Sequence, residues 1–186
     1  MQNNKLKSKL GPLWPLLRFF LSYALLFLIY SLYEKYSVTT GAIFDTDPVT
    51  KVVARQASAV IRFFGYQSHV IQSKYSLSMD LYIDESFVAR VIEGCNAVSI
   101  MILFVAFMFA FAQKFKTTAL YTLFGLFVLH IVNITRIAIL AIGIYEMPEN
   151  SAFLHDIVFP AVIYGVTMTL WLVWIKRYAP KPNRNE

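Results

Sequence analysis

The chain has 186 residues, of which 58% are hydrophobic and 16% aromatic, and its formal net charge is +6. A soluble domain averages roughly 45–50% apolar residues. Here the excess lies in long uncharged runs, which indicates an integral membrane protein that forms one unit over 1–186. The single cysteine excludes an intramolecular disulfide and a CxxC redox pair. The basic residues follow membrane topology, so no nucleic acid partner is expected.

Four apolar runs predict membrane-spanning helices, since roughly 20 helical residues are needed to cross a hydrocarbon core of about 30 Å. They cover about 15–33, 97–112, 118–145 and 157–175, and the second is short for a full crossing. Lysines precede the first run, as in a signal peptide, but this run is long and no small-residue cleavage site is evident, so we interpret it as an uncleaved span. We therefore expect an all-α integral membrane protein with about four transmembrane helices.

The distribution of charged residues predicts the orientation of these helices. Lysine and arginine gather before the first span, between the second and third spans, and after the fourth, and these segments contain a single acid, Glu186. The connections 34–95 and 146–156 contain every other acidic residue. Because positively charged connections stay in the cytoplasm, we expect both termini inside (N-in and C-in), the two acidic connections outside, and the chain in the cytoplasmic membrane.

The long outer loop, 34–95, is expected to contain local structure. Apolar residues recur at helical spacing over 49–64, with lysine, arginine and serine elsewhere around the helix. This pattern fits an amphipathic helix that lies in the membrane interface, and it fits equally a helix packed over the mouth of the bundle. The alternating stretches 69–72 and 76–83 predict a small β-hairpin, after which 87–92 leads into the cysteine.

This topology brings three chemically notable residues to the outer face from three different helices. Cys95 follows Gly94 at the outer start of the second span, and Arg136 lies in the outer third of the third span. His155 directly precedes the fourth span. Asn133 lies one turn below Arg136 on the same helical face, where we expect it to orient the guanidinium. Ionisable residues inside a membrane are costly and usually functional, so this grouping predicts a site.

These residue types suit nucleophilic catalysis by a thiol. A thiolate is favoured at the N-terminal end of a helix and beside a cation, which is where the topology places Cys95. His155 is suited to accept the thiol proton and return it to a leaving group. Arg136 is suited to stabilise the thiolate or a tetrahedral oxyanion. Gly94 permits close approach of a backbone to the sulfur.

Each of these residues also has a plain structural interpretation. A lone cysteine at a helix end is usually a small packed residue. His155 fits an interfacial cap, and Asp156 fits a helix N-cap. Arg136 fits an anchor that extends to the outer surface. The catalytic interpretation therefore depends on the three residues meeting at one face.

The motifs around these residues resemble those of the exosortase/archaeosortase family. The arginine motif reads Asn133-Ile134-Thr135-Arg136, and the histidine motif reads Phe153-Leu154-His155-Asp156. The cysteine motif reads Gly94-Cys95-Asn96-Ala97 and departs from the family's usual Cys-Ser-Gly at its last two positions. The resemblance covers roughly 88–166, and the short chain is similar to the compact variant called exosortase F.

The resemblance implies a protein-sorting cysteine transpeptidase with Cys95 as the nucleophile, Arg136 as the oxyanion or thiolate stabiliser and His155 as the general acid and base. The resemblance leaves open whether Arg136 and His155 exchange or share these two roles. Its substrates would be membrane-tethered proteins that end in a short motif, a transmembrane helix and a basic tail. The enzyme would cleave them through a thioacyl intermediate and pass them to a surface acceptor, with no metal or organic cofactor. Four further residues would support the site: Gly94, Asn96, Asn133 and Asp156.

Two other functions are compatible with the sequence. A four-helix membrane scaffold or transporter subunit would have the same topology with a dispensable cysteine, so replacement of Cys95 separates it from a sortase. A redox or haem protein would use His130 and His155. The topology places these two histidines roughly half a membrane apart, which disfavours a shared ligand site.

Overall fold

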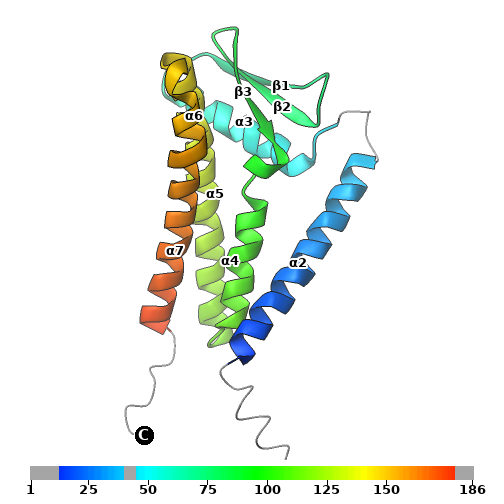
Figure 1. The fold of residues 1–186 in the computed structure, drawn as a ribbon, viewed down its shortest axis with the longest axis vertical. Coiled ribbons are helices and arrows are strands. Elements are labelled where there is room, and N and C mark those ends of the chain that lie inside the picture. Colours follow the sequence, from blue (N-terminus) through cyan, green and yellow to red (C-terminus); the bar gives the residue numbers. More distant parts are fainter. Residues whose placement is uncertain (1–12, 40–44, 179–186) are drawn as a thin grey trace, which may run out of the picture.

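The computed structural model describes residues 13–39 and 45–178 and consists of a helical bundle with a small sheet over one end (Figure 1). We call the covered end the sheet end and the opposite end, where Lys114 and Lys116 lie, the lysine end. The bundle contains α2 (Trp14–Thr39), α4 (Val98–Ala110), α5 (Phe115–Glu146) and α7 (Phe159–Tyr178). The sheet end contains α3 (Pro48–Phe63), β1 (Ser68–Gln72), β2 (Ser78–Ile83) and β3 (Ser86–Ile92). Short turns connect them: η1 (Glu93–Cys95), η2 (Pro148–Asn150), α6 (Ser151–Phe153) and the π-helix η3 (Leu154–Val158).

Three helical segments of the described chain are long and apolar enough to cross a membrane, namely Trp14–Ser37, Phe115–Glu146 and His155–Tyr178. The fourth expected span differs, because α4 has 13 residues and is therefore only about 20 Å long. Its helix begins at Val98 because η1 and the left-handed Ala97 (φ 62°) take up the preceding residues. The expected four spans are thus three long helices and one short apolar helix.

Helix α3 packs over the bundle instead of lying apart from it. Asp47 caps its first turn by accepting hydrogen bonds from the backbone N–H groups of Val49 (2.9 Å) and Thr50 (3.0 Å). Its apolar face, which includes the fully buried Ala57 and Ile61, joins one core with β2, β3 and α5. Of the two arrangements open for this amphipathic helix, the structure has the one in which it covers the mouth of the bundle.

The sheet is larger than the expected hairpin. Strands β1 and β2 pair antiparallel, as the alternating pattern predicts, and β3 adds a third antiparallel strand on the other side of β2. The β2–β3 turn places Asp84 and Glu85 at positive φ (47° and 66°), a conformation that suits a tight hairpin. An all-α description is therefore too simple for this chain, because the segment before the cysteine is a strand.

A second core holds α4, α5 and α7 together inside the bundle. Phe104 of α4 is fully buried, and it lies directly against Gly125 of α5. A Cβ atom added at Gly125 would lie 2.3 Å from Cζ of Phe104 and 2.4 Å from its Cε1. The glycine therefore permits the close approach of these two helices.

Replacing Gly125 by alanine is expected to lower the free energy of unfolding by about 1–3 kcal/mol, because the Phe104 ring has to leave its packed position. Unfolding of the purified protein in detergent measures this change. The matched control is Gly165→Ala in α7, where an added Cβ meets no atom within 4 Å. Equal stabilities of the two variants would contradict the close approach of α4 and α5.

Candidate active site

Cys95 lies where the chain changes from strand to helix. Strand β3 ends at Ile92, the turn η1 contains Gly94 and Cys95, and α4 begins three residues later (Figure 1). The thiol-bearing residue is half-buried and lies next to the N-terminal end of an apolar helix, the end that favours negative charge. Partial desolvation raises the pKa of the neighbouring Glu93 carboxyl, and a hydrogen bond from Tyr30 opposes this rise.

Asn96 holds the turn in place through a buried hydrogen-bond cluster. Its Oδ1 accepts from the backbone N–H of Val98 at 2.9 Å, at the start of α4. Its Nδ2 lies 3.1 Å from the hydroxyl of Tyr30 in α2 and 3.1 Å from that of Thr50 in α3. Only 3% of Asn96 is exposed, so these bonds form away from solvent, where they hold geometry most strongly. The amide that departs from the usual serine thus ties three helices to the cysteine turn.

Asn133 contacts the cysteine turn and not the arginine. Its Nδ2 donates to the backbone carbonyl of Cys95 at 2.8 Å, across the interface between α5 and η1. Asn133 is fully buried, and its Oδ1 has no hydrogen-bond partner within the described residues. The expected role of orienting Arg136 therefore does not appear, because the shared helical face brings Asn133 against the cysteine backbone instead. Asn133 therefore supports the site by fixing the position of the Cys95 backbone.

One cavity at the sheet end brings the three predicted residues together. Its volume is about 470 Å³, and Cys95 from η1, Arg136 from α5 and His155 from η3 all line it. Gly94 lines the same cavity as the cysteine. The remaining wall consists of strand β3, apolar residues of α5 and one proline: Val88, Ala89, Arg90, Val91, Ile92, Ile137, Leu140, Ile144 and Pro160.

His155 is paired with its neighbour in the chain. Its Nδ1 lies 2.7 Å from Oδ1 of Asp156, and the two side chains are 65% and 70% exposed. Asp156 lies inside the π-helix η3 and is therefore not an N-cap. Its carboxylate contacts the His155 imidazole instead. A proton on Nδ1 directed at the carboxylate leaves Nε2 free to exchange protons with other groups. The histidine is thus oriented by a carboxylate at the rim of the cavity.

The model of a protein family described as transmembrane exosortase matches residues 13–179, which is most of the chain. The chain belongs to the transmembrane exosortase family. Comparisons with curated proteins and with solved structures gave no match. The exosortase match includes all three residues that the cavity brings together.

The chain has one charged cavity residue, Arg90, that the sequence pattern did not single out. Arg90 of β3 lines the cavity, and its Nε donates to Oδ1 of Asp80 on β2 at 3.0 Å. The two residues are directly opposite each other in the β2–β3 register. The sequence pattern did not predict a strand over 86–92. Such a strand places Arg90 beside the cysteine turn.

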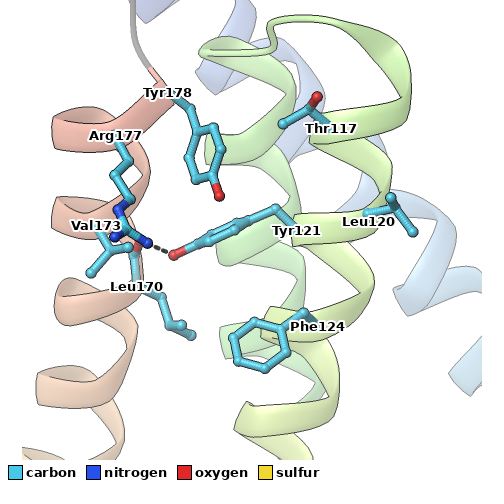
Figure 2. Close-up of a pocket in the computed structure, with 8 residues that line it drawn as sticks. All are labelled: Thr117, Leu120, Tyr121, Phe124, Leu170, Val173, Arg177 and Tyr178. Carbon is cyan, nitrogen blue, oxygen red and sulfur yellow. Dashed lines mark hydrogen bonds between the residues drawn. The ribbon is translucent and has the colours of Figure 1, made fainter.

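A second cavity lies at the lysine end, between α5 and α7 (Figure 2). Its volume is about 550 Å³, and Tyr121 crosses it to donate a hydrogen bond to the carbonyl of Leu170 at 2.7 Å. Among the described residues, no cysteine, histidine or acid lines it. Within residues 13–39 and 45–178, no group of three or more histidine, cysteine or acidic residues is placed to hold a metal ion. The cavity at the sheet end is therefore the candidate active site.

Proposed function

We propose that the chain is a membrane-embedded cysteine transpeptidase that removes C-terminal sorting signals from membrane-tethered proteins. The observation that carries the proposal is the single cavity lined by Cys95, Arg136 and His155. A thiol, a fixed cation and an imidazole oriented by a carboxylate are the groups that acyl transfer through a cysteine needs. Membership of the transmembrane exosortase family supports the same class of reaction.

In the proposed mechanism, His155 takes the thiol proton and the Cys95 thiolate attacks the carbonyl carbon of the scissile amide. Arg136 stabilises the oxyanion of the tetrahedral intermediate. His155, held by Asp156, then gives its proton to the leaving amine, and a thioester on Cys95 remains. A nucleophile of the surface acceptor, or water, gives its proton to His155 and attacks this thioester, which releases the processed protein and restores the Cys95 thiolate. Asn96 and Asn133 keep the cysteine turn in register with the other two groups.

The chain is proposed to lie in the cytoplasmic membrane with the sheet end outside. The segment up to Arg18, the segment 114–116 and the segment after the fourth span together carry ten of the 17 lysine and arginine residues but only one of the 11 acidic residues, which supports this orientation. A membrane-impermeant maleimide is therefore expected to label intact cells at Cys95, the only cysteine of the chain. The control is the Cys95→Ala chain, which stays unlabelled when it is purified from cells treated in the same way. Labelling only after the membrane is opened would overturn the orientation.

The function is tested by co-expression with a reporter protein. The reporter ends in a short motif, an apolar helix and a basic tail taken from a protein of the genome that encodes the chain. Cells with the chain are expected to shorten the reporter by its helix and tail, whereas cells without it leave the reporter whole. If every such reporter stays whole with the chain present, the sorting function is wrong and a scaffold role gains support.

A further inference from the structure

Strand β3 forms one wall of the candidate active site along its length. Five consecutive residues, Val88–Ile92, line the cavity. Successive side chains of a strand point to opposite faces of the sheet, so a cavity lying on one face would touch only alternate residues. A cavity that touches every residue from 88 to 92 runs along the edge of the strand.

This edge of β3 has no partner strand within the described chain. The strand order is β1-β2-β3, so β2 occupies one side of β3 and the other side is open. Among the described residues, no backbone hydrogen bond outside the β2 ladder joins Val88–Ile92 to another segment. An open strand edge presents unpaired N–H and C=O groups, which are a template for another extended chain.

The open edge leads directly to the nucleophile. The chain passes from Ile92 through two residues of η1 to Cys95, and Figure 1 shows β3 running from the sheet into α4. Facing the edge across the cavity are Ile137, Leu140 and Ile144 of α5. An extended segment lying between the two walls would have backbone partners on one side and an apolar surface on the other.

We infer that the segment of substrate next to the scissile bond binds as an additional strand on the open edge of β3. The inference rests on the proposed function and names how its substrate is held. Backbone hydrogen bonds to β3 give affinity without regard to sequence, and alternate side chains pack against the apolar residues of α5 and give selectivity. The strand register fixes the distance from the bound segment to Cys95, so the scissile carbonyl reaches the thiol.

Photo-crosslinking with a matched pair of positions tests this placement. Ile92 on β3 and Ile71 on β1 are isoleucines on the two opposite edges of the same sheet, and they are 48% and 47% exposed. The photoreactive residue p-benzoylphenylalanine replaces each in turn, in a Cys95→Ala background that binds the reporter without cleaving it. The Ile92 probe is expected to capture the reporter next to its scissile bond, and the Ile71 probe is not.

A second probe position distinguishes strand pairing from mere proximity. Arg90 lies two residues before Ile92 on β3, about 7 Å away at a rise of roughly 3.4 Å per residue, and the two side chains point to the same face of the sheet. A reporter segment paired with the strand is therefore expected to be captured about two residues further along when the probe is moved from Ile92 to Arg90. Capture at the same reporter residue from both positions would overturn the pairing.

Backbone methylation tests the hydrogen bonds themselves. Synthetic copies of the reporter segment compete with the reporter for processing, and each copy carries one N-methyl group at a different residue. Methylation is expected to weaken competition about fivefold to tenfold at alternate residues only, where the N–H faces β3. Equal effects at every position, or none, would contradict an added strand.

The outcomes separate this inference from the function on which it rests. If the unmodified chain shortens the reporter but Ile92 captures nothing, the sorting function stands and the strand pairing is wrong. If the unmodified chain leaves every reporter whole, the function itself has failed in its own assay.

Discussion

Replacing Cys95 by serine is expected to lower the rate of reporter processing at least about a thousandfold, the scale at which loss of a nucleophile acts. The hydroxyl of serine stays protonated beside His155 far more firmly than the thiol, so the attacking anion is scarce. The variant keeps the size of the side chain and leaves the Asn133 bond to the residue 95 carbonyl intact. Folding is therefore expected to be unchanged.

The matched control for this variant is Ser99→Ala, four residues further along the chain in the first turn of α4. Ser99 is exposed and does not line the cavity, so its loss is expected to leave processing unaltered. Reporter cleavage is followed over time in cells with equal amounts of each variant. Processing by Cys95→Ser at the rate of the unmodified chain would make the cysteine dispensable, as a non-enzymatic scaffold requires.

Replacing Arg136 by glutamine is expected to lower kcat about a hundredfold to a thousandfold, because an oxyanion partner acts mainly in the transition state. Arg136→Lys keeps a positive charge but loses the planar donor geometry of the guanidinium, and an intermediate loss of about tenfold is expected. KM for the reporter should change little in both variants. Kinetics of the purified protein in detergent measure the two quantities separately.

An arginine that only anchors α5 at the membrane surface gives a different result. In that case Arg136→Gln would lower stability and leave kcat of the folded fraction unchanged, and lysine would replace arginine fully. The matched control is Arg55→Gln on α3, where the arginine is exposed and lies outside the cavity. This control is expected to keep both kcat and stability.

The grouping of Cys95, Arg136 and His155 was predictable because it depends on the direction in which each helix runs. Direction follows from the positions of lysine and arginine along the chain, which is a local property of the sequence. The amphipathic period of α3 and the alternation of β1 and β2 are local in the same way. Each was recognisable from residue spacing alone.

The contacts that hold the cysteine turn were not predictable in this way. Asn96 binds Tyr30 and Thr50, which lie 66 and 46 residues away in the chain, and no periodic pattern encodes such a meeting. The same holds for Asn133, whose partner is a backbone carbonyl 38 residues away. Strand β3 was missed because a short segment beside an apolar run has no clear period of its own.

The most direct test of a cysteine transpeptidase at this cavity is the mass of the intact chain after incubation with the reporter and without an acceptor. The expected result is an adduct equal to the processed reporter, attached at Cys95 and released by hydroxylamine as a thioester is. The adduct should be absent from Cys95→Ala. Continued processing by Cys95→Ala, or an adduct on another residue, would contradict the mechanism.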